Sequence, residues 1–165
     1  MMCAVKPWIT TILAILIGCS QTSTSSVSPV TFSSSILSGF DNQDIEVDIV
    51  DARPLEQVNP NAADAIYQTL ERANPRARWH RVQTVDANSR NFITVKIITL
   101  ESTFSQANWS GIVKLDVEQS HGSLSPRQRA IEKAVTLSNL LGYKSASDAL
   151  NKAFEQAMSE LVAGF

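Results

Sequence analysis

The sequence predicts an α+β domain in which an antiparallel meander carries two helices packed on one face. Two segments, 92–100 and 109–118, place apolar side chains at every second position, which is typical of half-buried strands. A third segment, 145–162, repeats apolar residues at the spacing of one helix face. An isolated helix of this kind is marginal in water, so we expect it to bury that face against the strands.

Length and composition indicate one globular domain. The chain has 165 residues, of which 44% are hydrophobic and 18% charged, and this balance is too apolar for a disordered chain. The formal net charge of -2 lacks the basic excess that neutralises many phosphates, so we expect no nucleic-acid partner.

The N-terminal segment has the features of a cleaved signal. Lys6 precedes an apolar run from Trp8 to Ile17, shorter than the roughly 20 residues of a permanent transmembrane helix. The run ends in Leu16-Ile17-Gly18-Cys19, which resembles the lipobox of bacterial lipoprotein precursors. The resemblance implies cleavage between Gly18 and Cys19, fatty acids such as palmitate on Cys19, and attachment to a membrane through them.

The resemblance also implies a location. Residue 20 is Ser, and an Asp there would favour retention in the inner membrane, so we expect the outer membrane with the domain on its periplasmic face. The inner membrane is the alternative. An ordinary secretory signal peptide or an uncleaved anchor are the alternatives to the lipobox. Cys3 and Cys19 are the only cysteines, so the domain after them contains no disulfide of its own.

Three regions follow from this interpretation: a signal peptide at 1–18, an acylated cysteine with a Ser-rich tether at 19–40, and a periplasmic domain at 41–165. Serine and threonine dominate the tether, which is typical of a flexible linker. Its apolar residues Phe32, Ile36, Leu37 and Phe40 are exceptions, and we expect them either to form a first strand or to dock on the domain.

The first half of the domain combines strands with a helix. Alternation over 45–50 predicts a strand that ends before Pro54. Asn59-Pro60 predicts the start of a helix with its apolar face over 62–73, and Asn74-Pro75 predicts its end. A short strand is expected over 79–85.

The second half holds the meander and the last helix. The polar segment 102–108 is expected to connect strands 92–100 and 109–118. Residues 125–139 are ambiguous, because local propensity favours a helix whereas Ile131, Val135 and Leu137 would share one face of a strand; we predict a strand that continues the meander. Ser145 and Asp148 predict a capping box at the start of the last helix, and Gly164 closes it.

This order of elements resembles that of small envelope lipoproteins. The ending from Ser145 to Leu161 is similar to the terminal helix of YajG-like proteins and of the auxiliary lipoproteins of envelope ABC transport systems. Residues 95–118 are similar to their paired central strands. The resemblance implies a non-enzymatic component of envelope maintenance or lipid transport, and it supplies no catalytic residues.

A cluster of cations is the candidate ligand site. Arg76, Arg78, His80 and Arg81 flank Trp79, and positive charge beside an indole suits anionic lipid head groups or lipopolysaccharide phosphates. The alternative is a solvated surface after a helix.

Other chemistry has little support in the sequence. Asp48, Asp51 and Glu56 with Arg53 suggest an acid/base pair only weakly, because Asp48 and Asp51 fall on opposite faces of a strand. Two histidines without a cysteine cluster or an HExxH motif predict no metal site, and we expect no cofactor. We therefore expect a non-enzymatic binding or scaffold protein with an envelope protein or lipid as partner. The alternatives are a tethered periplasmic hydrolase and a structural subunit of an envelope ring or secretion assembly.

Overall fold

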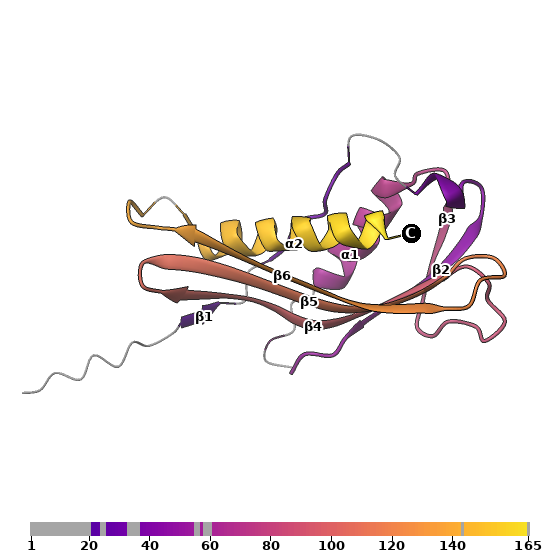
Figure 1. Cartoon of the computed structure of the whole chain (residues 1–165), viewed down its shortest axis with the longest axis horizontal. Coiled ribbons are helices and arrows are strands. Elements are labelled where there is room, and N and C mark those ends of the chain that lie inside the picture. The colour runs from indigo at the N-terminus through magenta and orange to yellow at the C-terminus, as the bar shows by residue number, and fades with distance from the viewer. Residues whose placement is uncertain are drawn as a thin grey trace, which may run out of the picture.

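A computed structural model describes residues 21–23, 26–32, 37–54, 57, 61–142 and 144–164. Its elements are β1 (Gln21–Ser23), a 3-10 turn η1 (Ser38–Phe40), β2 (Asp44–Asp51), α1 (Ala62–Ala73), β3 (Arg78–Val82), β4 (Phe92–Ser105), β5 (Asn108–Ser120), β6 (Arg127–Ser138) and α2 (Ala146–Ala163). The strands form one sheet in the order β3-β2-β4-β5-β6, with β1 paired to β4, and both helices lie on one face of it (Figure 1). The predicted α+β class is confirmed.

The sheet is mixed, so the prediction that all its strands are antiparallel is wrong. β2 runs parallel to both β3 and β4, and only β4, β5 and β6 form an antiparallel meander. Parallel neighbours need a crossover connection, and α1 supplies it between β2 and β3. The chain then crosses to the other side of β2 before it enters β4.

The β4–β5 hairpin is longer than predicted. The segment 102–108, expected to be a connection, belongs almost wholly to the two strands, and only Gln106 and Ala107 form the turn. Both turn residues have positive φ angles, 50° and 59°, as a tight two-residue hairpin turn requires. Asparagine and glycine are the usual residues there, and their absence hid the turn in the sequence.

The ambiguous segment 125–139 contains a strand, as predicted. β6 pairs antiparallel with β5 from Arg127 to Ser138, and Ile131 is buried opposite Leu115. Tertiary pairing has therefore overridden the local preference for a helix.

The last helix begins with the predicted capping box. The Ser145 hydroxyl accepts a hydrogen bond from the Asp148 backbone nitrogen at 3.2 Å, and the Asp148 carboxylate accepts one from the Ser145 nitrogen at 2.7 Å. The other end of α2 meets Arg129 of β6, whose guanidinium donates to the carbonyl oxygens of Glu160 and Leu161. A cation at the last carbonyls also suits the helix dipole. The stripe that α2 buries against the sheet comprises Ala149, Leu150, Ala153, Phe154, Ala157, Met158, Leu161 and Val162.

Part of the predicted tether belongs to the folded unit. Val27, Leu37 and Phe40 are buried in the core, at 2–3% exposure. The backbone nitrogen of Ser28 donates to Asn151 of α2, and that of Val30 donates to Thr69 of α1, so this segment lies against both helices. The core therefore includes residues before the predicted boundary at 41. Leu37 and Phe40 dock as the alternative interpretation expected, whereas Ile36, the signal peptide and Cys19 lie outside the described residues.

Candidate functional site

The predicted cation cluster is divided between the two faces of the sheet. β3 pairs with β2 so that Arg78 lies beside Asp44 and His80 beside Glu46, on the face without helices. Arg81 lies on the opposite face, where its guanidinium contacts the Asp64 carboxylate of α1 at 2.5 Å. The four side chains of the cluster therefore do not converge on one ligand.

The Asp44 carboxylate, at the start of β2, contacts two residues of this cluster, Arg78 and His80. Arg78 donates from Nε and Nη2 to its two carboxylate oxygens at 2.8 and 2.6 Å, and His80 Nε2 lies 2.9 Å from Oδ1. Hydrogen bonds from Arg78, and then from His80, hold the pKa of the Asp44 carboxyl well below its usual range. The Asp44 carboxylate thus neutralises the charge of Arg78, which the sequence predicts as a contact for an anionic ligand.

The remaining cations of the cluster are also paired. Arg76 contacts Asp41 at 3.2 Å, and Arg81 lies over the ring of Tyr67 at 5.9 Å from its centroid. Trp79, expected to help grip a ligand, donates from Nε1 to the carbonyl oxygen of Asn74 and packs beside the core. These contacts tie the α1–β3 turn together and favour the interpretation of a solvated surface.

Asp48 and Asp51, the carboxylates considered as a possible acid/base pair, also lie on opposite faces of the sheet. The Asp51 carboxylate binds the guanidinium of Arg53, which is buried. Asp48 lies on the open face, where burial raises the pKa of its carboxyl. Glu56 lies outside the described residues.

The two histidines also lie apart. His80 contacts Asp44, whereas His121 follows β5, where its Nε2 lies 3.3 Å from the Gln43 amide and its ring stacks 4.4 Å from Phe40. Among the described residues, no three His, Cys, Asp or Glu side chains gather as metal ligands would. In the same part of the chain, no helix is long and apolar enough to cross a membrane.

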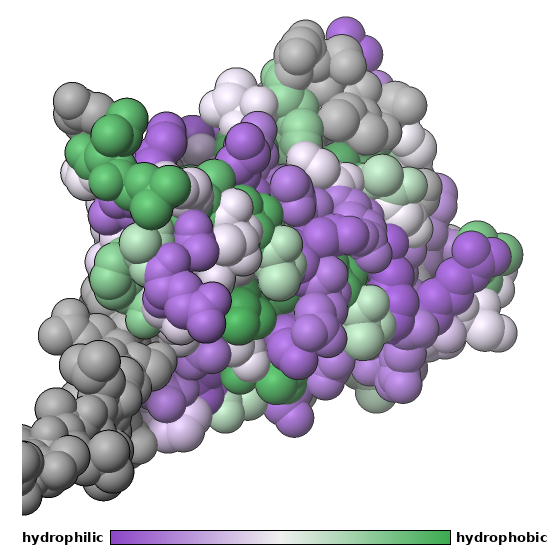
Figure 2. Space-filling model, turned by 60° about the vertical axis from the view of Figure 1, so that its left-hand side comes forward, coloured by the Kyte–Doolittle hydropathy of each residue, from purple (hydrophilic) through white to green (hydrophobic). Residues whose placement is uncertain are grey.

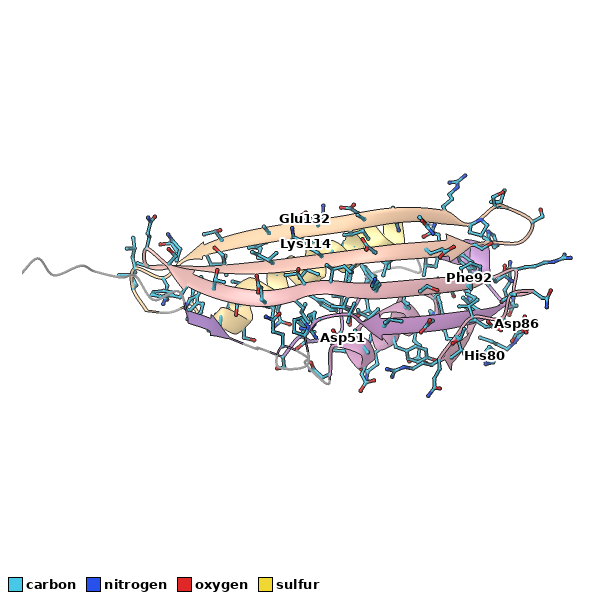
Figure 3. The ribbon with its side chains drawn as sticks, turned by 90° about the horizontal axis from the view of Figure 1, so that it is seen from below. Asp51, His80, Asp86, Phe92, Lys114 and Glu132 are labelled. Carbon is cyan, nitrogen blue, oxygen red and sulfur yellow. The ribbon has the colours of Figure 1, made fainter. Side chains whose placement is uncertain are left out.

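The open face of the sheet is the surface that sequence reasoning did not single out. α1 and α2 cover the opposite face, so the outward side chains of β4, β5 and β6 are left without a covering layer (Figure 3). At Lys114 and Glu132, which are directly paired across β5 and β6, the charged groups lie 2.7 Å apart. The alternation of polar residues along these strands was the signal for this face.

A hollow of about 500 Å³ lies on this open face toward the end where β4 begins. The outward side chains that line it come from three strands: Thr94, Lys96, Asp116, Glu118, Gln128 and Ala130. Both signs of charge are present, and backbone pairing joins the three strands that carry them, with one register shift between β4 and β5, after Ile97. Such a rigid, mixed-charge surface can hold a polar partner through hydrogen bonds and ion pairs.

Comparisons with known proteins found likeness in structure alone. No protein-family model matches the chain, and no curated protein sequence matches it significantly. A Xanthomonas campestris protein of the DUF330 family is 16% identical with a TM-score of 0.45, covering 84% of this chain and 88% of its own. A PelC dodecamer variant from Paraburkholderia phytofirmans is 12% identical with a TM-score of 0.47, covering 88% and 99%.

A third solved structure is a hypothetical protein from Chlamydia trachomatis. It is 13% identical with a TM-score of 0.45, and the match covers 73% of this chain and 94% of that one. Likeness at this level assigns neither a family nor a function to the chain.

Proposed function

We propose that this chain is a lipid-anchored protein of the outer membrane whose α+β domain acts on the periplasmic face as a non-enzymatic scaffold that binds another envelope protein. The observation that carries the binding role is the uncovered face of β4, β5 and β6 with its mixed-charge hollow. The lining side chains are mainly polar, which favours a protein surface over lipid acyl chains as the occupant. The lipobox at Leu16–Cys19 supports the anchor.

Replacing Cys19 tests the anchor. We expect the intact mass of the membrane-bound wild type to show the loss of residues 1–18 and the gain of acyl chains. We expect Cys19→Ala to be neither cleaved at this position nor acylated. Cys3→Ala is the matched control, because Cys3 lies within the segment predicted to be removed, and it should be processed and anchored normally. A wild-type chain that keeps its first residues or carries no lipid would contradict the anchor.

A photo-crosslinking amino acid at Gln128 tests the binding surface. Gln128 is exposed on the open face and lines the hollow, and Gln68 is an exposed glutamine on α1, away from that face. We expect intact cells to give a discrete crosslinked protein from position 128 and not from position 68. Equal crosslinking at both positions, or none at 128, would show that the open face is not the binding surface.

A further inference from the structure

The most exposed large apolar side chains among the described residues lie together in one loop. Leu140 and Leu141, between β6 and α2, are each 80% exposed. The backbone nitrogen of Gly142 donates to the carbonyl oxygen of Asn139 at 2.9 Å, which closes a β-turn with the two leucines at its corners. Turn corners normally carry polar residues or glycine, so two leucines there require an explanation.

This loop is held in place at one end of the sheet. The Asn139 backbone nitrogen donates to the carbonyl oxygen of Ala107 in the β4–β5 turn at 2.8 Å, and Asn139 Oδ1 accepts from the backbone nitrogen of Lys144 at 2.7 Å. The leucines therefore project from a fixed turn. In Figure 2, where this end of the molecule is turned forward, strongly hydrophobic (green) surface projects from it.

β1, the described element nearest to Cys19 in the sequence, lies at the same end. β1 pairs with β4 so that Gln21 lies opposite Phe104, close to the hairpin turn (Figure 1). Gln21 is only two positions after Cys19 in the sequence. A membrane that holds acyl chains on Cys19 is therefore adjacent to this end, because two residues span at most about 7 Å.

Aromatic and charge content at this end also suits a lipid surface. Phe104 and Trp109, half-buried across the hairpin, contact each other in a tilted arrangement with ring centroids 4.9 Å apart, and indole rings favour the boundary between lipid and water. The described residues that meet here are 21–23, 103–109, 138–142 and 144, and Lys144 is the only charged residue among them. The nearest acidic residues along the chain are Glu101 in β4 and Asp148, which is engaged in the capping box with Ser145.

We propose that the turn Asn139–Gly142 is a lipid-docking tip that inserts Leu140 and Leu141 into the head-group region of the membrane that carries Cys19. This inference rests on the proposed anchor and adds an orientation to it. The domain stands on its end, with the strands of the meander running away from the membrane. From Trp109 to Glu118, at about 3.4 Å per residue, the hollow is then held roughly 30 Å above the surface.

Tryptophan quenching tests the tip on the full-length chain. Leu141→Trp adds one indole at the tip, and Leu124→Trp adds one at an exposed leucine in the β5–β6 loop at the opposite end of the sheet. Each chain is reconstituted into vesicles of phosphatidylethanolamine and phosphatidylglycerol, with or without bromine on the acyl chains. The emission of the new tryptophan is the emission of each variant minus that of the wild type. We expect bromine to quench most of this emission for Leu141→Trp and almost none of it for Leu124→Trp. Adding Leu140→Ser to the Leu141→Trp chain should at least halve the quenching.

The outcomes separate the tip from the anchor. A chain that floats with the vesicles but shows no extra quenching at 141 overturns the tip and leaves the anchor standing. A chain that does not float overturns both proposals. Emission at 141 that is shielded from water but not quenched by bromine assigns the leucines to a protein partner or a second copy, which also overturns lipid docking.

Discussion

Replacing Asp51 with alanine is expected to lower the free energy of unfolding by about 3 kcal/mol, because it leaves the buried charge of Arg53 without its partner. The Arg53 side chain is 1% exposed and that of Asp51 is 17% exposed. Asp51 accepts hydrogen bonds from Arg53 Nε at 2.8 Å and from Nη2 at 2.5 Å. The remaining nitrogen, Nη1, donates to the carbonyl oxygen of Leu100 in β4 at 3.1 Å, so the pair fastens the end of β2 to its neighbour. Urea denaturation of both proteins measures the loss.

A double variant provides the control for this pair. Replacing both residues, as Asp51→Ala with Arg53→Met, removes the unpaired charge and leaves an apolar side chain of similar length. We expect the double variant to be more stable than Asp51→Ala alone. If the losses from Asp51→Ala and Arg53→Met, each made alone, simply add up to the loss in the double variant, the ion pair does not stabilise the end of β2.

The same pair gives stability a dependence on pH. Burial opposes ionisation of Asp51, but the hydrogen bonds and charge of Arg53 outweigh it, and the pKa of the carboxyl is lowered in the folded protein. The stabilisation is therefore present above the unfolded pKa of about 3.9 and is lost as the pH falls through the folded pKa. The difference in stability between wild type and Asp51→Ala should shrink over that acidic range.

The sequence predicted the elements better than their arrangement. Period-two alternation and the Ser145–Asp148 capping box depend on neighbouring residues, and the structure confirms the strands and helix they predicted. The parallel placement of β2 depends on where α1 returns the chain. A helix between two strands was itself the signal of a crossover, and the repetitive meander that follows obscured it.

The candidate site was harder to predict because the burial of a charged side chain and its ion-pair partner depend on tertiary contacts. Arg78 and Arg81 are close in sequence, yet the alternation of β3 places them on opposite faces, where Asp44 and Asp64 pair with them. Nothing in their spacing identified those carboxylates. Leu140 and Leu141 were uninformative in sequence, because an apolar pair before a glycine is as typical of a core as of a surface.

A side chain at Gly111 is expected to unfold the domain or to separate α2 from the sheet. A Cβ atom there would overlap the carbonyl group of Ala149 and lie 2.5 Å from the backbone nitrogen of Leu150, both in the first turns of α2. These atoms belong to a helix backbone and cannot rotate away as a flexible side chain could. In the sequence, Gly111 is an isolated glycine within the strand segment 109–118, whereas its structural role is to let a helix approach the sheet closely.

Gly111→Ala should cost about 3 kcal/mol, at the upper end of overpacking effects, and Gly111→Val should leave no cooperative thermal transition, because it adds further atoms to the same contact. Gly39→Ala is the matched control: its nearest contact would be His121 Cε1 at 3.8 Å, an ordinary distance, so its stability should stay close to that of the wild type. Circular dichroism melts and urea titrations distinguish these cases. A Gly111→Ala protein as stable as the wild type would show that α2 lies farther from β5 than the structure places it. Most of the apolar stripe of α2 would then need a different partner, since β5 is the strand that this helix contacts most.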